Sequence, residues 1–349
     1  MILFRICRQP AFLQTWTDDN ITLRVTKNRS IVYRGTPAAL TASACGSKAA
    51  PCGFSTPDQS IIRTADANLL MALYGHAGDG YKNGSLYTTV FYASRDDGLT
   101  WSYLSRVDVI EAMLAGQGPG EGPCEPTMAT LSDGRVLAAF RLGGGRPLWL
   151  SYSSDHGGTW TDPAPAKGTQ APGAPGVASA VYGVWPQLLV LSNGALVLAS
   201  GRPGIGFWVS PEADGANWIG WDVEAEHSKN LPSDPWDAAH GDGTTSYTGI
   251  AEVEPGMVLL ACKESRPPPL TSFTRNPRLY IARVDPGTAS IGMYTLAQTT
   301  TAHCPPPAID SGAPGWPTRS LLHCGCAPAL PRRRQNQRLG PVRGGPEGL

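Results

Sequence analysis

Two copies of one octet, placed at a fixed distance, restrict the fold of this chain more than any other feature of its sequence. The copies, Ser94–Trp101 and Ser153–Trp160, share the frame S-x-D-x-G-x-T-W, and their tryptophans are 59 positions apart. A decayed third copy ends at Trp218, which is 58 positions after Trp160. A fixed spacing of this kind indicates a fold that is assembled from similar units placed one after another.

A second pattern repeats in step with the octets. Two apolar segments flank a turn of the Asp-Gly or Asn-Gly kind, which is typical of a β-hairpin because glycine accepts the backbone geometry of a tight two-residue turn. Four hairpins are predicted in this way, at Ser60–Gly75, Pro126–Arg141, Pro186–Arg202 and Tyr247–Glu264. Repeats of about 60 residues with four short strands each favour an all-β fold of the β-propeller type.

Composition agrees with this fold class and excludes several functions. Gly and Pro number 41 and 32, about a fifth of the chain against roughly 12% in ordinary proteins, which disfavours long helices. Because 28 basic side chains balance 28 acidic ones, no long-range field exists that would gather nucleic acid. No apolar stretch approaches the roughly 20 residues of a membrane-spanning helix. We expect a monomer with no nucleic-acid partner and no membrane span.

Cysteine usage gives no indication of a metal or of a disulfide framework. Eight cysteines in 349 residues are too few for a disulfide-built scaffold. The His303-Cys304 and His323-Cys324 pairs contain metal-ligand residue types, but their spacing matches no zinc pattern. We therefore expect no cofactor. The apolar start of the chain is interrupted by charges and shows no clear signal peptide, so the compartment stays open, with the extracellular or secretory pathway favoured.

The aspartates of the octets are interpreted as determinants of the fold. An aspartate can accept hydrogen bonds from backbone amides in a tight turn, the glycine takes a conformation that other residues resist, and the tryptophan buries a large ring between sheets. The alternative is a catalytic pair of Asp155 with His156, but adjacent side chains on a turn diverge. Residues outside the octets must therefore carry any activity.

The octet frame is similar to the Asp-box of the sialidase (neuraminidase) superfamily, and the resemblance covers roughly residues 55 to 285. It implies a six-bladed β-propeller, of which about four blades are evident here. We expect the propeller at 55–300, an N-terminal segment at 1–54 that partly forms a strand pair of the propeller, and a disordered Pro/Gly/Arg-rich tail at 301–349.

The same resemblance implies an activity. Members of the superfamily are retaining glycoside hydrolases that remove terminal sialic-acid-type sugars with a tyrosine nucleophile. A glutamate activates this tyrosine, an aspartate is the acid/base, and arginines grip the substrate carboxylate through charge-assisted hydrogen bonds. Asp-boxes also occur in propellers that cleave nothing. The alternative is therefore a non-catalytic propeller that binds glycans or proteins.

Four of these roles fall in the family's order along the chain. The resemblance implies that Glu125 is the activating glutamate, that Arg141 and Arg202 bind the carboxylate, and that Tyr247 is the nucleophile. Glu264 then resembles the glutamate that orients the family's first arginine. Taken singly, each residue has a structural alternative, such as a strand aromatic for the tyrosine or a surface charge for an arginine.

Two roles are less well matched. Asp79 is offered as the acid/base, and the alternative is an ordinary turn aspartate. The family's first-blade arginine has no counterpart in Ser55–Ser60, and the nearest arginines are Arg63 and Arg34. If the resemblance carries the mechanism, the site residues converge on one axial face, with the phenol of Tyr247 roughly 2.6 to 3.2 Å from its activating glutamate.

Overall fold

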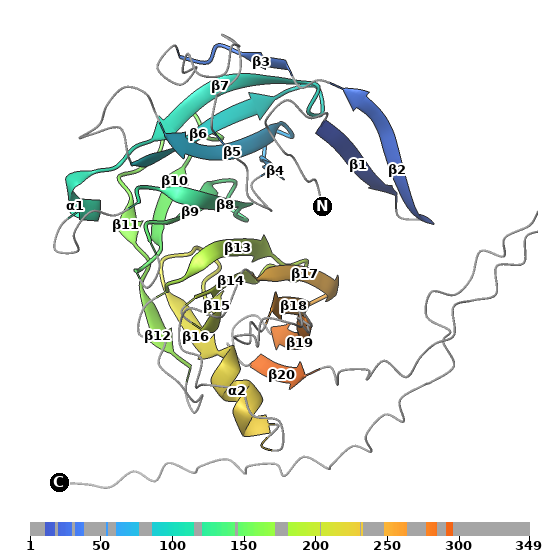
Figure 1. The fold of residues 1–349 in the computed structure, drawn as a ribbon, viewed down its shortest axis with the longest axis vertical. Helices are drawn as coiled ribbons and strands as arrows, with labels where there is room; N and C mark the ends of the chain where they lie inside the picture. The colour runs from blue at the N-terminus through green and yellow to red at the C-terminus, as the bar shows by residue number, and fades with distance from the viewer. Residues whose placement is uncertain are drawn as a thin grey trace, which may run out of the picture. The chain divides into compact units, whose positions relative to one another are not determined.

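A computed structural model of the chain consists almost entirely of β-strands (Figure 1). The structure describes residues 11–17, 20–29, 32–37, 54, 61–76, 86–114, 121–143, 146–171, 181–202, 204–230, 232, 248–263, 277–284 and 291–295. Within these ranges the only helices are α1 (Glu111–Leu114) and α2 (Val223–Asn230), and neither is long or apolar enough to cross a membrane. The predicted all-β class is confirmed for this part of the chain. The predicted tail, 301–349, lies outside the described residues.

All four predicted hairpins are present, and each opens a separate antiparallel sheet. Their strands alternate with turns in the positions that the sequence indicates. The hairpin strands are β4 (Ile61–Arg63), β5 (Leu69–His76), β8 (Cys124–Thr130), β9 (Val136–Arg141), β13 (Val184–Val190), β14 (Leu196–Gly201), β17 (Gly249–Glu254) and β18 (Met257–Lys263).

Each hairpin is extended by a third and a fourth strand, so that each of these four sheets contains a four-stranded meander in chain order. This is the strand order of a β-propeller blade. The added strands are β6 (Tyr87–Ser94), β7 (Thr100–Val107), β10 (Trp149–Ser153), β11 (Ala164–Pro165), β15 (Ile205–Ser210), β16 (Trp218–Asp222), β19 (Pro277–Val284) and β20 (Ile291–Thr295).

Two sheets carry an additional outer strand that the sequence pattern did not predict. Strand β3 (Val32–Arg34) pairs in parallel with β7, and β12 (Gly168–Gln170) pairs in parallel with β16. In both cases an earlier part of the chain is added to the outer edge of a later meander. Strands β1 (Ala11–Thr17) and β2 (Asn20–Arg29) form a two-stranded sheet of their own.

The turns of the first three hairpins contain three residues rather than the predicted two, whereas the fourth has the predicted two, Pro255 and Gly256, because Glu254 pairs with Met257. In the second sheet the N–H of Leu131 donates to the carbonyl of Arg135 at 2.8 Å, and Gly134 N–H donates back to Leu131 at 3.0 Å. Gly134 has φ +86°, and Ala67, Gly194 and Gly256 also have positive φ in the other three hairpin turns. A turn closed by one residue of positive φ is the common three-residue hairpin loop.

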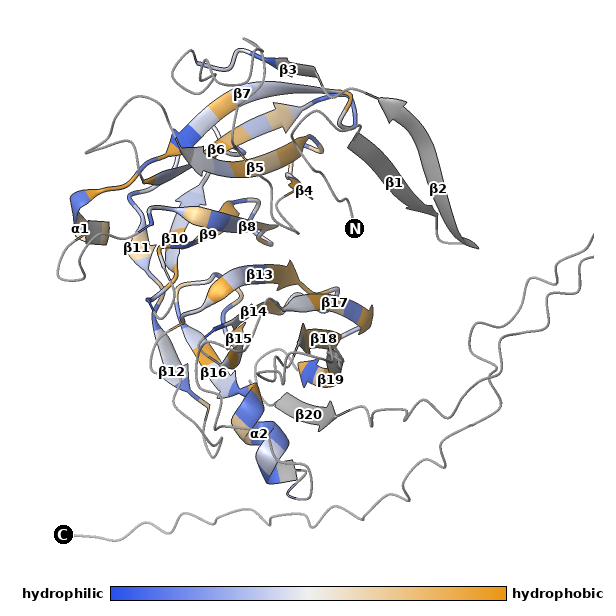
Figure 2. Ribbon diagram, in the orientation of Figure 1, coloured by the Kyte–Doolittle hydropathy of each residue, from blue (hydrophilic) through white to orange (hydrophobic). Residues whose placement is uncertain are grey.

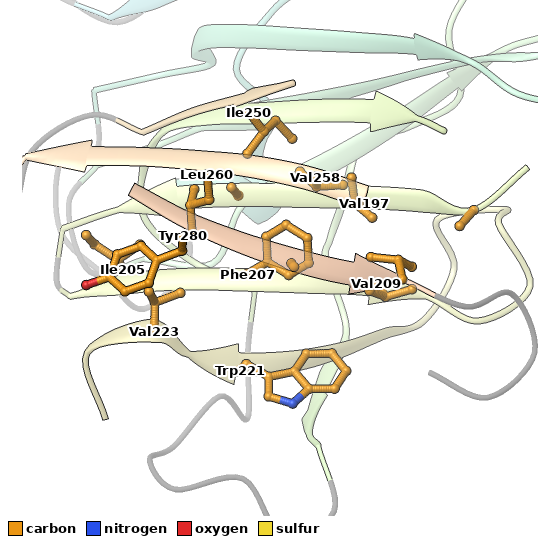
Figure 3. Packing of buried hydrophobic residues seen from close by; sticks show 14 of the residues in the cluster. Val197, Ile205, Phe207, Val209, Trp221, Val223, Ile250, Val258, Leu260 and Tyr280 are labelled. Carbon is orange, nitrogen blue, oxygen red and sulfur yellow. The ribbon is translucent and has the colours of Figure 1, made fainter. Parts of the chain in front are cut away.

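The middle strands of the second and third sheets are buried at nearly every position because a hydrophobic cluster covers each of their two faces. All residues of β14 and β15 are buried, as are all of β9 except Arg141. Figure 3 shows one such interface, in which Ile205 of β15 lies near Tyr280 of the fourth sheet and Val197 of β14 lies near Val258. Similar clusters join the first sheet to the second and the second to the third. Burial of each large apolar side chain stabilises the fold by about 1.5 to 3 kcal/mol.

The first strands of successive sheets lie side by side. Strands β4 and β5 contact β8, β8 contacts β13, and β13 contacts β17 (Figure 1). Residues at the starts of β8 and β13 therefore approach one another although they are about 60 positions apart in the chain. This arrangement brings side chains from different repeats into one site.

The two complete octets form the same hydrogen-bonded turn. In the first, Asp96 accepts the N–H and the hydroxyl of Thr100 at 2.8 and 2.7 Å, and Ser94 Oγ accepts the N–H of Gly98 at 2.8 Å. In the second, Asp155 accepts the same two donors of Thr159, both at 2.8 Å. The carboxylates are used to close turns, which agrees with their interpretation as fold determinants.

The octet tryptophans contact the core in related ways. Trp101 and Trp218 are each 1% exposed and lie in the fourth strands of their meanders, β7 and β16. Trp160 lies outside a strand, but its ring stacks on Phe91 of the preceding sheet with a centroid distance of 4.2 Å. Trp218 likewise belongs to the cluster between the second and third sheets. The octet turns therefore help to join neighbouring sheets.

Candidate functional site

Glu125 and Arg141 form an ion pair at one end of the second sheet. The hairpin register pairs Cys124 with Arg141, so the adjacent Glu125 reaches across to the guanidinium. Arg141 Nη1 donates to Glu125 Oε1 at 2.8 Å, and the two side chains are 14% and 4% exposed. Burial opposes the charge on the guanidinium, but the neighbouring carboxylates outweigh it and raise the pKa of Arg141. The hairpin predicted from the sequence thus places these two site residues in contact.

The second oxygen of Glu125 binds the next sheet. The main-chain N–H of Trp185 donates to Glu125 Oε2 at 2.7 Å. Both residues precede a proline, at a bulge near the start of the first strand of their sheets, with φ of +45° and +51°. Such a conformation is uncommon for residues other than glycine and is found at binding and catalytic sites. The bond fixes the carboxylate of Glu125 between two repeats.

Arg202 is displaced by one position from the place of Arg141 in its sheet. Cys124 pairs with Arg141 in the second sheet, whereas Val184 pairs with Gly201 in the third. Arg202 follows strand β14 and has φ +44°. It therefore lies at the same end of its sheet as Arg141 does, just beyond the strand. The expectation that both guanidinium groups face one carboxylate stays a prediction.

Two further side chains belong to this neighbourhood and were missed by the sequence interpretation. Glu121 Oε2 lies 2.9 Å from Arg141 Nη2, so the guanidinium contacts two carboxylates. Burial, followed by the proximity of Cys124 and Glu121, raises the pKa of Tyr87. The Tyr87 ring meets that of Tyr74 edge to face, with centroids 5.4 Å apart. No motif of the sequence marks these residues, because the contacts join separate strands and loops.

The other proposed site residues are not brought into this group by the described structure. Tyr247, Asp79 and Glu264 lie outside the described residues, and their roles stay predictions. Arg34 lies on β3, the outermost strand of the first sheet, so β7, β6 and β5 separate it from the first strand β4. Arg63 is on β4, but its guanidinium binds Asp97 at 3.1 Å and the carbonyl of Ala67 at 2.6 Å. Neither described arginine therefore supplies the missing first arginine next to Arg141.

A cavity of about 830 Å³ lies along the first strands of the four sheets. Its lining is mainly apolar, with Leu188, Val190 and Ile250 among the contributors, and Figure 2 shows hydrophobic residues on the strands around it. Arg63 and Glu252 add charges to the lining, whereas Glu125 and Arg141 do not take part. The ion pair is the better candidate for chemistry, because the described residues that line the cavity are mainly apolar.

A search for metal ligands covers the part of the chain that the structure describes. No three side chains of the His, Cys, Asp or Glu type come together there as ligands. Burial, followed by the charge of Glu125, raises the pKa of the Cys124 thiol well above its usual range. The thiol beside the ion pair is therefore held protonated and is a poor metal ligand.

The fold and the site define an Asp-box protein built from consecutive four-stranded meanders, with a carboxylate–guanidinium pair at one end of the second sheet. Residues 49–232 match the BNR repeat-like domain family, which is more than half of the chain. The chain belongs to this family, within the sialidase-like Asp-box superfamily. The resemblance inferred from the octets is thus confirmed.

Several solved structures match part of the chain. A protein of unknown function from Dyadobacter fermentans is 18% identical, with a TM-score of 0.46 over 64% of this chain and 52% of that one. A Hadza microbial sialidase is 18% identical, with a TM-score of 0.43 over 70% and 46%. An α-L-arabinanase from Penicillium chrysogenum is 17% identical, with a TM-score of 0.39 over 70% of both chains. The chain spans about half the length of the first two. No curated protein matches it in sequence.

Proposed function

We propose that this protein is a sialidase-like glycoside hydrolase that removes a terminal sialic-acid-type sugar with retention of configuration. The observation that carries the proposal is the contact of Glu125 with Arg141 at 2.8 Å. These are the residue types that the superfamily resemblance assigns to activation of the nucleophile and to binding of the substrate carboxylate. Membership of the BNR repeat-like family supports the same class of activity.

In the proposed reaction the phenolic oxygen of Tyr247 attacks the anomeric carbon while Glu125 takes the phenolic proton. Asp79 gives a proton to the glycosidic oxygen, which leaves with the electrons of the broken bond. Water then attacks the same carbon and gives a proton to Asp79, and the tyrosine oxygen departs and recovers its proton from Glu125. A neutral nucleophile suits an anomeric carbon that bears a carboxylate, since an anion would be repelled.

The contacts of Glu125 are compatible with this role. Each carboxylate oxygen has two acceptor sites. The bonds from Arg141 and from the N–H of Trp185 therefore leave capacity for a phenolic proton. One donor is the main-chain N–H of Trp185 and the other is the ion-paired guanidinium of Arg141. Both are fixed in place, so the carboxylate of Glu125 is oriented before a substrate binds.

Release of a fluorescent leaving group from a sialoside tests the proposal. The wild-type protein should turn the substrate over, and Tyr247→Phe should reduce kcat by at least about a hundredfold. Tyr152→Phe is the control, because this tyrosine lies on β10 and stacks with Arg135. Proton NMR of the first product should show the anomer of the substrate. Absence of turnover by the folded wild-type protein would reject the proposal.

A second function is favoured by one observation. Both terminal nitrogens of Arg141 are already bound by carboxylates of this chain. This arrangement suits a non-catalytic protein that binds glycans or proteins. Retained binding of a glycan by a wild-type protein without hydrolytic activity would support this alternative.

A further inference from the structure

The guanidinium of Arg141 is held between two carboxylates that come from different segments. Nη1 contacts Glu125 Oε1 at 2.8 Å, and Nη2 contacts Glu121 at 2.9 Å and 3.2 Å through its two oxygens. The remaining nitrogen, Nε, is buried and has no hydrogen-bond partner among the described residues. A ligand carboxylate can therefore reach Arg141 only at the terminal nitrogens, where Glu121 now lies.

The carboxylates of Glu125 and Glu121 differ in burial and in the number of their hydrogen bonds. Glu125 is 4% exposed and binds a backbone N–H with its second oxygen. Glu121 is 47% exposed, and among the described residues its carboxylate has, apart from Arg141, only a 3.8 Å contact from the thiol of Cys124. Of the two, the Glu121 carboxylate is the one that can be displaced.

Displacement of this carboxylate requires no movement of the chain. The N–H of Glu121 donates to the carbonyl of Leu142 at 3.0 Å, and its own carbonyl accepts the N–H of Tyr87 at 2.7 Å. The backbone is thus fixed on both sides while the side chain can rotate towards solvent. An ion pair with a half-exposed partner contributes little to stability, so a ligand carboxylate can replace it at small cost.

We propose that Glu121 occupies, in the free protein, the place on Arg141 that the carboxylate of an acidic sugar takes in the complex. The inference rests on the proposed function, because it concerns the same arginine and the same substrate class. Glu121 is then a specificity-determining residue, which an acidic sugar must displace and a neutral sugar need not. Glu121, Glu125 and Arg141 together carry a net negative charge. Removal of the Glu121 charge should therefore favour the binding of an anionic ligand.

Calorimetric titration with N-acetylneuraminic acid and with its uncharged methyl ester tests this inference. Glu121→Gln should tighten binding of the acid about fivefold, the loss of one weak competing ion pair. Glu121→Ala, which leaves no acceptor, should tighten it at least as much. Binding of the methyl ester should change less than about twofold in both variants, because the ester brings no carboxylate to compete. Glu254→Gln is the matched control, since it removes an exposed charge at the end of β17.

The outcomes separate this inference from the proposed function. Equal affinity of the wild type and of both Glu121 variants for the acid would overturn the role of Glu121 and leave the proposed function standing. An equal gain for the acid and the ester would also overturn it, because charge competition would not be the cause. Failure of every variant and of the wild type to bind the acid would overturn both.

Discussion

The main-chain N–H of Trp185 donates a hydrogen bond of 2.7 Å to the carboxylate of Glu125, a residue 60 positions earlier. The two residues occupy the same place in consecutive repeats, since each precedes a proline near the start of the first strand and each has positive φ. The side chain of one repeat thus binds the backbone of the equivalent position in the next. The repeat length itself decides which residues meet at the site.

The buried and the exposed carboxylate on Arg141 should contribute differently to stability. Glu125→Ala removes a buried partner and leaves the N–H of Trp185 without its acceptor, so we expect the free energy of unfolding to fall by about 2 to 3 kcal/mol. Glu121→Ala should change it by less than about 1 kcal/mol. Urea unfolding followed by tryptophan fluorescence measures both. An equal loss of unfolding free energy in the two variants would contradict the view that the buried carboxylate stabilises the fold more than the exposed one.

The carboxylate of the second octet should stabilise the fold without taking part in chemistry. Asp155→Ala removes both bonds from Thr159 and should lower the free energy of unfolding by about 1 to 2 kcal/mol. The decayed octet offers a matched comparison, because Asp214 accepts one backbone N–H at 2.8 Å, from Ala216, and a weaker contact at 3.4 Å. Asp214→Ala should therefore cost less. A loss of hydrolytic activity per folded molecule in Asp155→Ala would contradict the structural role.

Stability should fall in acid through the octet turns. The pKa of Asp96 is lowered by the backbone and side-chain hydrogen bonds of Thr100. Burial opposes ionisation of Asp155, but the hydrogen bonds of Thr159 and Ser153 outweigh it and lower the pKa of this carboxyl. A carboxyl with a lower pKa in the folded state stabilises the fold above its unfolded pKa of about 4, and this contribution is lost as pH falls through the folded pKa.

The urea midpoint between pH 6 and pH 2.5 measures this effect. A double variant, Asp96→Asn with Asp155→Asn, should start from a lower midpoint and lose less of it on acidification. Asp162→Asn is the control, since Asp162 is exposed and outside the octet turns. Parallel acid profiles for the wild type and the double variant would refute the assignment.

Alanine substitution at two glycines of positive φ distinguishes the cost of backbone strain from the cost of disturbed packing between sheets. A Cβ on Gly194 would meet nothing within 4 Å, whereas one on Gly157 would lie 2.7 Å from Leu70 of the preceding sheet. Gly194→Ala should cost about 1 kcal/mol from backbone strain alone. Gly157→Ala should cost about 1 to 3 kcal/mol more, because Leu70 must move. Thermal unfolding of both variants compares them, and similar losses would exclude a packing role for the second octet turn.

Much of the fold could be predicted from local sequence, because its determinants are local. Apolar segments around glycine turns specify the hairpins, and the hairpin from Pro126 to Arg141 already places Glu125 near Arg141. The parallel strand β12 could not be predicted, because its three residues show no strand pattern of their own. They form a strand only by pairing with β16, which follows them by about 50 positions in the chain. Glu121 was missed for a similar reason, because it contacts Arg141 only once two separate segments of the chain have come together. Tyr247, Asp79 and Glu264 stay predictions.

Strand β12 also affects how the protein unfolds. It precedes the third meander in the chain, yet it is hydrogen-bonded along β16, the last strand of that meander. Detachment of the segment that leads out of the second sheet therefore uncovers the edge of the third. Consecutive sheets are coupled through the backbone as well as through their faces, so the second and third sheets should lose structure together in one cooperative step rather than one repeat at a time.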